Sequence, residues 1–154
     1  MAVEVAGTRF MGLDVGDRWV GVAFSDLGGV IATPFAIVDR TAGDYIHAIA
    51  HMVTEHDAGL VIVGLPRAMD GTIGKQAEKV QDFVRRLSID VVVPIEFRDE
   101  RLSTVSAGRL MREANSKRTR KKVRDDAAAA AVILQSYLDE RRLMSANRDD
   151  ESRD

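Results

Sequence analysis

Five short apolar segments along the chain predict β-strands. The first two, residues 8–14 and 19–25, are rich in Val, Leu and Phe and are separated by a short polar stretch, which predicts an antiparallel hairpin with a tight turn. Residues 30–38 follow as a third strand. Residues 60–64 are wholly apolar, as is typical of a strand buried on both faces of a parallel sheet, and residues 91–97 form the last predicted strand.

Between and after these strands, apolar residues recur every three or four positions, which predicts helices. One covers residues 44–56, a second begins near Ile73, a third is capped by Ser103 or Thr104, and the last runs from about residue 125 to 141. The order of elements, βββαβαβα, predicts an α/β fold with a mixed five-stranded sheet flanked by helices. In such sheets ligands bind beyond the carboxyl ends of the strands, so we expect functional residues there.

Length and composition fit one domain. The chain has 154 residues, of which 45% are hydrophobic and 30% charged, and a second domain would lack the material for its own core. We expect the domain to cover residues 1–141 and the polar residues 142–154 to form a disordered tail. The absence of cysteine excludes thiol catalysis, disulfides and thiolate zinc sites. No apolar run approaches the roughly 20 residues of a membrane span, so we expect a cytoplasmic protein with no membrane partner.

Three acidic residues stand at the ends of predicted elements: Asp14 closes the first strand, Glu100 follows the fifth and Asp126 opens the last helix. If folding brings them within about 5 Å of one another, each pair of charges repels by roughly 3 kcal/mol at an effective dielectric constant near 20, and a divalent cation relieves this repulsion. Such oxygen ligands suit Mg²⁺ or Mn²⁺, and two ions support phosphodiester hydrolysis. Taken singly, however, Asp14 suits a turn and Asp126 suits the first turn of a helix, and spacing alone does not assemble a site.

A dense positive segment precedes Asp126, although the formal net charge of the chain is -2. Its six cations are Lys117, Arg118, Arg120, Lys121, Lys122 and Arg124. Such a run is commonly a solvated flexible loop, but its position beside the expected metal site favours contact with the phosphate backbone of a nucleic acid. Arg101, directly after Glu100, is a further candidate for this contact.

The loop after the fourth strand is another candidate for nucleic-acid contact. Residues 64–74 contain three glycines, which permit close backbone approach to a phosphate, and Arg67 and Lys75 add positive charge. The segment lacks the spacing of a P-loop, and an ordinary connection between strand and helix explains it equally well. His47 and His51 lie four residues apart, but no acid is placed between them as in a metalloprotease motif, so we interpret them as surface histidines.

Four ordered blocks of sequence span nearly the whole chain, from about Arg9 to Glu140. They are Gly12-Leu13-Asp14-Val15-Gly16 with Gly21-Val22-Ala23-Phe24-Ser25-Asp26, Val63-Gly64-Leu65-Pro66 with Met69-Asp70-Gly71, Asp99-Glu100-Arg101-Leu102-Ser103-Thr104, and Asp126 followed by alanines and Ile133-Leu134-Gln135-Ser136-Tyr137-Leu138. Together these blocks resemble the YqgF/RuvX family of pre-16S ribosomal RNA nucleases, which are also described as Holliday-junction resolvase-like proteins.

This resemblance implies a ribonuclease H-like fold and assigns the family's acidic site to Asp14, Glu100 and Asp126. Asp125 is adjacent, and because a helix turns about 100° per residue only one of the two faces the site; counting back from the Ile-Leu-Gln block selects Asp126. The chain departs from the family at Trp19, where a basic residue is usual, and at Arg124 or Asp125, where an apolar residue is usual. The resemblance therefore assigns no substrate contacts near Trp19.

The resemblance implies a metal-dependent endonuclease that processes the 5′ end of pre-16S ribosomal RNA, either free or within a pre-ribosomal particle. A branched-DNA resolvase would use the same chemistry but normally needs a symmetric dimer, and the sequence leaves open whether the protein is a monomer or a dimer. The first hairpin also resembles the phosphate-binding hairpin of actin-like kinases, which need two such domains where this chain has one. The third alternative is an RNA-binding module without catalytic activity.

Overall fold

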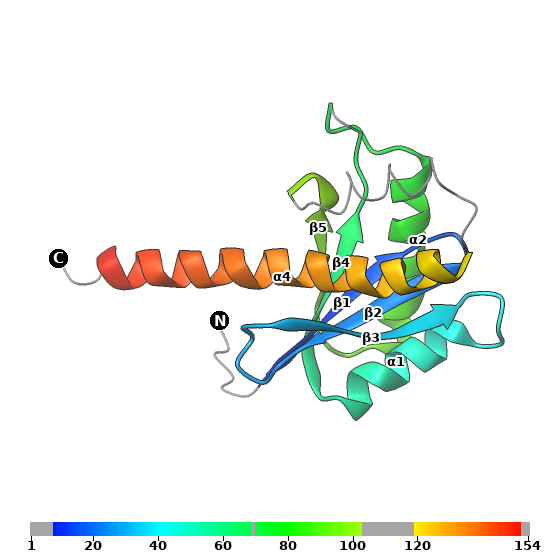
Figure 1. Cartoon of the computed structure of the whole chain (residues 1–154), viewed down its shortest axis with the longest axis horizontal. Coiled ribbons are helices and arrows are strands. Elements are labelled where there is room, and N and C mark those ends of the chain that lie inside the picture. The colour runs from blue at the N-terminus through cyan, green and yellow to red at the C-terminus, as the bar shows by residue number, and fades with distance from the viewer. Residues whose placement is uncertain (1–7, 69, 103–118, 152–154) are drawn as a thin grey trace.

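A mixed five-stranded sheet forms the centre of the fold (Figure 1). The computed structural model describes residues 8–68, 70–102 and 119–151, and for residues 119–126 and 148–151 it describes the helical backbone but not the side chains. The strands are β1 Arg9–Val15, β2 Trp19–Ser25, β3 Ala32–Asp39, β4 Ala58–Leu65 and β5 Ile95–Asp99. The helices are α1 Tyr45–Glu55, α2 Lys75–Asp90, the short 3-10 helix η1 Glu100–Leu102 and α4 Thr119–Glu151.

The strand order is β3-β2-β1-β4-β5. The pairs β3–β2 and β2–β1 are antiparallel, whereas β1–β4 and β4–β5 are parallel. The predicted mixed sheet is confirmed, as is the predicted hairpin, whose turn is closed by the N–H of Gly16 donating to the carbonyl of Trp19 at 2.9 Å. Because β1, β4 and β5 run in one direction, their carboxyl ends lie at the same edge of the sheet.

Helices cover both faces of the sheet, with α1 and α2 on one face and α4 on the other (Figure 1). Successive side chains of a strand point to opposite faces. Met11 and Leu13 of β1 therefore belong to the core beneath α1 and α2, whereas Phe10 belongs to the core beneath α4. By the same alternation, Asp14 lies on the face that α4 covers. Among the parts of the chain that the structure describes, no helix is long and apolar enough to cross a membrane.

The last strand begins later than predicted. Residues 91–94 connect α2 to β5, and the chain first meets β4 where the N–H of Val61 donates to the carbonyl of Pro94 at 3.0 Å. Pro94 has no N–H to give to a sheet, which favours the first position of a strand or the residue before it. Val91 and Val93 pack against the core next to the sheet, so their apolar character reflects burial without strand pairing.

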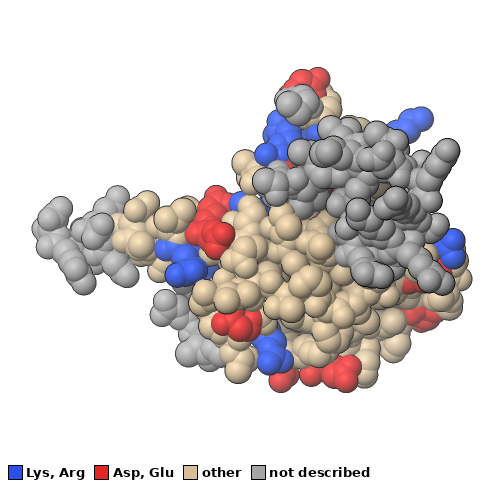
Figure 2. All heavy atoms as spheres, in the orientation of Figure 1, with Lys and Arg blue, Asp and Glu red and all other residues tan. Residues whose placement is uncertain are grey.

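The last helix is longer at both ends than predicted. It begins at Thr119, so Arg120, Lys121 and Lys122 lie in a helix and not in a loop. It continues to Glu151, so residues 142–151 of the tail predicted to be disordered are helical, and this end of α4 projects beyond the body of the domain (Figure 2). The reason is local, because α4 contains no Gly or Pro and is rich in Ala, Arg and Leu. The third predicted helix, capped by Ser103 or Thr104, lies outside the described residues.

Candidate active site

Asp14 is a buried carboxylate near the carboxyl end of β1. Only 2% of its surface is exposed. It lies opposite Gly21 of β2, and because Leu13 lies beside Val63 of β4, the next step of the parallel register puts Asp14 beside Gly64. Both residues directly opposite Asp14 on the neighbouring strands are therefore glycines.

Glu100 brings a second carboxylate to the same place. It is the first residue of η1, directly after β5, and is 3% exposed. A Cβ atom at Gly64 would lie 2.9 Å from Oε1 and 3.2 Å from Cγ of Glu100, so the Glu100 side chain occupies the space above Gly64. Cβ positions paired on neighbouring strands are about 5 Å apart, so the Glu100 carboxyl above Gly64 and the side chain of Asp14 belong to one small region on the α4 face of the sheet.

Asp126, the third predicted acid, belongs to α4, and its side chain lies outside the described residues. Contacts of later residues of α4, whose side chains are described, establish how this helix crosses the sheet. A Cβ atom at Gly12 would lie 2.9 Å from the carbonyl oxygen of Ala130, and the ring centroids of Phe10 and Tyr137 are 6.1 Å apart. α4 therefore runs along β1 in the opposite direction, with its earlier residues nearer the carboxyl end of β1. Among the side chains that the structure describes, which exclude Asp126, no group of three or more His, Cys, Asp or Glu could hold a metal ion.

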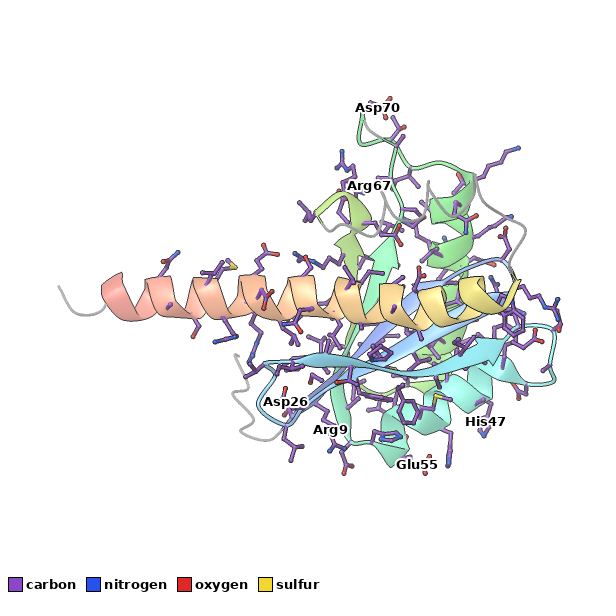
Figure 3. All side chains as sticks on the ribbon, viewed as in Figure 1. Arg9, Asp26, His47, Glu55, Arg67 and Asp70 are labelled. Atoms are coloured by element: carbon purple, nitrogen blue, oxygen red, sulfur yellow. The ribbon has the colours of Figure 1, made fainter. Side chains whose placement is uncertain are left out.

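Positive side chains lie beside the loop between β4 and α2, at the same end of the sheet, and an acidic side chain lies at its tip (Figure 2). Arg67 is exposed on this loop (Figure 3), and Lys75 is the exposed first residue of α2. Five more of the cations predicted to contact nucleic acid belong to the positive segment before Asp126. Lys117 and Arg118 lie outside the described residues, as do the side chains of Arg120, Lys121 and Lys122.

The tip of this loop is a tight, hydrogen-bonded turn. The N–H of Ala68 donates to the carbonyl of Thr72 at 3.1 Å, and the carboxylate of Asp70 accepts from the N–H and the hydroxyl of Thr72 at 3.0 and 2.7 Å. Both hydrogen bonds hold the pKa of Asp70 below its ordinary value, and the bond from the hydroxyl has the larger effect. Gly71 has a φ of 86°, a left-handed conformation that favours glycine. The loop therefore has a defined shape.

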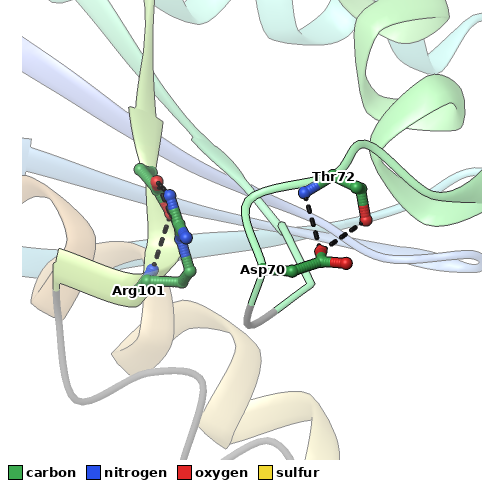
Figure 4. A network of polar contacts seen from close by, with 4 residues as sticks. Asp70, Thr72 and Arg101 are labelled. Carbon is green, nitrogen blue, oxygen red and sulfur yellow. Dashed lines mark hydrogen bonds and ion pairs between the residues drawn. The ribbon is translucent and has the colours of Figure 1, made fainter.

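Arg101 is held beside this loop by Asp99 (Figure 4). Its Nε donates to both carboxylate oxygens at 3.1 and 3.0 Å, and its Nη2 donates to Oδ2 at 2.6 Å. This hydrogen bonding lowers the pKa of Asp99 and raises the pKa of Arg101, so both stay charged at neutral pH. Nη1 lies 3.4 Å from where a Cβ atom at Gly71 would be, which turns the guanidinium toward the loop. Arg101, predicted to contact nucleic acid, thus has an internal partner, while 34% of its side chain stays exposed.

Two features of this region are missed by the sequence prediction. Gly64 belongs to β4 and not to the loop, and its missing side chain accommodates Glu100 and Ile133, whereas the sequence suggested that it lets a phosphate approach the backbone. The pairing of Asp99 with Arg101 is also missed, although the dense charged run from Arg98 to Arg101 was a signal for it.

The histidines lie elsewhere in the fold. His47 and His51 are both exposed on α1, and Figure 3 shows His47 at the far end of the molecule from Arg67. His51 lies 3.6 Å from Glu55, one turn later on the same helix. Their interpretation as surface histidines is confirmed.

Known proteins resemble this chain over most of its length. The family model described as "RuvX: Holliday junction resolvase" matches residues 8–140. A protein of Thermoanaerobacter pseudethanolicus named "Putative pre-16S rRNA nuclease" is 44% identical over 133 residues, covering 85% of this chain and 96% of that protein. Proteins with the same name from Dehalococcoides mccartyi and Mycobacterium ulcerans are 48% identical over 127 residues and 42% identical over 144 residues. These cover 82% and 92% of this chain, and 94% and 85% of the respective relatives.

A solved structure shares the fold. The RuvC protein of T. thermophilus, in complex with a Holliday junction substrate, superposes with a TM-score of 0.55 at 16% identity, covering 88% of this chain and 96% of that chain. This likeness confirms the predicted ribonuclease H-like fold. Since the family model and the relatives cover nearly all of the described sheet and its helices, the chain belongs to the RuvX family.

Proposed function

We propose that this protein is a divalent-metal-dependent endonuclease that cuts structured RNA, with Asp14, Glu100 and Asp126 as its metal ligands. The observation that carries the proposal is the position of the Glu100 carboxylate above Gly64, next to Asp14. At a separation of about 5 Å, two carboxylates would repel by roughly 3 kcal/mol at an effective dielectric constant near 20, and a cation bound by both would turn this repulsion into attraction. Oxygen ligands of this kind fit Mg²⁺ or Mn²⁺.

The course of α4 supports Asp126 as the third ligand. From Gly12 to Asp14 the strand advances by about 6.6 Å, and from Ala130 back to Asp126 the helix recedes by about 6 Å. Because α4 runs along β1 in the opposite direction, these two steps bring the backbone of Asp126 level with Asp14. Asp126 also lies one turn before Ala130, on the stripe of α4 that meets β1, whereas Asp125 is rotated from that stripe by about 100°.

A bound metal ion would supply an activated water and stabilise negative charge on the phosphodiester oxygens. The protein's own residues then have separate tasks. Asp14 and Glu100 are held by burial, which fixes the geometry of ligation. Arg67 and Arg101 lie at the same end of the sheet and orient the phosphate backbone of the substrate.

The substrate proposed here is the 5′ end of pre-16S ribosomal RNA. Its support is the name shared by relatives that are 42% to 48% identical. The positive segment over residues 117–124 fits a nucleic-acid substrate, because its charge would attract phosphates to the end of α4 that carries Asp126.

Cleavage of a precursor fragment tests the proposal. Wild type, Asp14→Asn, Glu100→Gln and Asp126→Asn are compared with and without Mn²⁺, and we expect each substitution to abolish cleavage. Two matched controls replace acids next to the site: Asp17→Asn, whose carboxylate is exposed and pairs with Lys79, and Asp125→Asn. Both controls should cleave like wild type.

Metal binding gives a second measurement, independent of catalysis. At a Mn²⁺ concentration about 100 times the Kd, a single site stabilises the folded protein by about 2.7 kcal/mol. For a domain of this size that raises the midpoint of thermal unfolding by about 5–11 °C. We expect this shift in wild type and in both controls, and its loss in all three acid variants. Loss of cleavage in only one variant would contradict the three-ligand site, and RNA binding by wild type without Mn²⁺-dependent cleavage would indicate a binding module.

Cleavage of branched DNA is a second candidate function. The description of the matching family model and the fold shared with a junction-bound RuvC favour it. The same variants are therefore assayed on a four-way DNA junction, and the oligomeric state is measured by light scattering. A resolvase makes paired cuts as a symmetric dimer. Selective cleavage of RNA by a monomer would therefore exclude the resolvase function.

A further inference from the structure

Ser136 of α4 holds the segment that carries Glu100. Its Oγ accepts hydrogen bonds from Nε and Nη2 of Arg98 at 3.1 and 2.8 Å, and its hydroxyl donates to the carbonyl of Leu102 at 3.3 Å. Arg98 stands two residues before Glu100, and Leu102 stands two residues after it. One hydroxyl group therefore ties both sides of Glu100 to the same point on α4.

The Arg98 side chain depends on this contact for its orientation. It is 11% exposed, and its Nη1 pairs with the carboxylate of Glu140, one helical turn after Ser136. A guanidinium has five N–H donors in a rigid plane, and buried donors without acceptors are destabilising. Ser136 and Glu140 therefore determine how Arg98, and with it the end of β5, packs on α4.

Gln135 makes an equivalent contact at the opposite edge of the sheet. Its amide oxygen accepts from the N–H of Ala32, and its amide nitrogen donates to the carbonyl of Val30, both at 2.8 Å. Two consecutive residues thus fasten α4 to the start of β3 and to the end of β5, which are the two edges of the sheet. Of these two contacts, only that of Ser136 adjoins a predicted metal ligand.

We propose that Ser136 and Arg98 are positioning residues that set the place of Glu100 relative to the other acids of the metal site. The inference rests on the proposed function, because it requires Glu100 and Asp126 to share a metal ion. Asp126 lies on the same helix as Ser136, ten residues earlier. A helix is rigid over this length of about 15 Å. The contacts that hold the Glu100 segment on Ser136 therefore also fix the distance between Glu100 and Asp126.

Mn²⁺ affinity of the intact protein, measured by titration calorimetry, tests the inference without any use of catalysis. Ser136→Ala should weaken Mn²⁺ binding by roughly 10-fold to 100-fold, as is typical when a residue that orients a metal ligand is removed. Ser136→Thr keeps the hydroxyl and should retain most of the affinity. Arg98→Lys removes the two-point contact with Ser136 and should resemble Ser136→Ala.

Gln135→Ala is the matched control. It removes two hydrogen bonds between the same helix and the sheet, at a residue adjacent to Ser136, and should lower the midpoint of thermal unfolding while leaving Mn²⁺ affinity close to that of wild type. Wild-type affinity in Ser136→Ala, or an equal loss in Gln135→Ala, would overturn the inference while leaving the proposed function intact. Absence of Mn²⁺ binding in wild type would overturn both.

Discussion

Replacing Gly64 by alanine tests the central geometry of the site with a single methyl group. The added Cβ atom would lie 2.5 Å from Cδ1 of Ile133 and 2.9 Å from Oε1 of Glu100. Ordinary contacts between carbon atoms are about 3.5–4.0 Å, so Ile133 must retreat by about 1 Å or more and the carboxylate by about half an ångström. The substitution therefore moves Glu100 without changing its chemistry.

The expected effects on stability and on metal binding differ in size. Overpacking a filled core costs about 1–3 kcal/mol, offset by the roughly 0.5–1 kcal/mol by which alanine is favoured over glycine in a strand. At about 2–4 °C per kcal/mol, the midpoint of thermal unfolding should fall by several degrees. Metal ligation tolerates errors of only about 0.2 Å, and a misplacement on the order of 1 Å costs about 100-fold in rate. We expect Gly64→Ala to stay folded, to bind Mn²⁺ weakly and to lose most of its cleavage activity.

Gly59→Ala is the matched control, because it makes the same change in the same strand at the end remote from Glu100. The three heavy atoms nearest to its Cβ would belong to the side chain of Thr8, which begins the described chain next to β1. This variant should lose some stability in thermal unfolding but keep the Mn²⁺ affinity measured by titration calorimetry. Wild-type Mn²⁺ affinity in Gly64→Ala would refute the idea that Glu100 must lie above Gly64 to bind metal.

Three further predictions concern charge and the end of α4. Because Arg101 lowers the pKa of Asp99, their pairing stabilises the fold above the unfolded-state pKa of about 3.9, and this contribution is lost as the pH falls through the lower folded-state value. Urea unfolding should therefore find Asp99→Asn less stable than wild type at pH 7, with the difference vanishing in strong acid. If all six cations of residues 117–124 contact phosphates, RNA affinity measured by fluorescence anisotropy should fall roughly 10² to 10³ fold between 50 and 200 mM salt, and a fall below about tenfold would contradict this. Residues 143–147 are exposed, so a chain that ends at Arg142 should unfold within about 0.5 kcal/mol of the full-length protein.

The central strands are predictable from sequence because they are continuous apolar runs buried on both faces, and α2 because its burial is periodic. In α2 the residues that predicted the helix, among them Ala77, Val80 and Leu87, are the ones it buries. The ends of α4 are not predictable in this way. Arg and Lys are typical both of a solvated loop and of a helix, so a run such as residues 117–124 carries no local signal for where the helix begins.

The candidate site is predictable only as a set of residue types. The sequence blocks identify Asp14 and Glu100, but the role of Gly64 depends on the register of β1 with β4, which joins Leu13 to Val63, 50 positions away. No local pattern specifies that register. For Ser136 a signal did exist, because it is a polar residue in a stretch of α4 that is otherwise largely apolar, and a polar residue that packs against the sheet usually has a partner there.

In the proposed metal site, the length of each acidic side chain would suit the place of its backbone. Asp14 lies on β1 itself, and a short side chain suffices there. Close packing of α4 on β1, where Gly12 leaves no room for a Cβ atom against Ala130, favours an equally short side chain at Asp126. Glu100 starts beyond β5, two strands from β1, and its longer side chain lies above Gly64 of the strand between them. A proposed ligand set of two aspartates and one glutamate would therefore suit the strand order β1-β4-β5 and the absence of a side chain at Gly64.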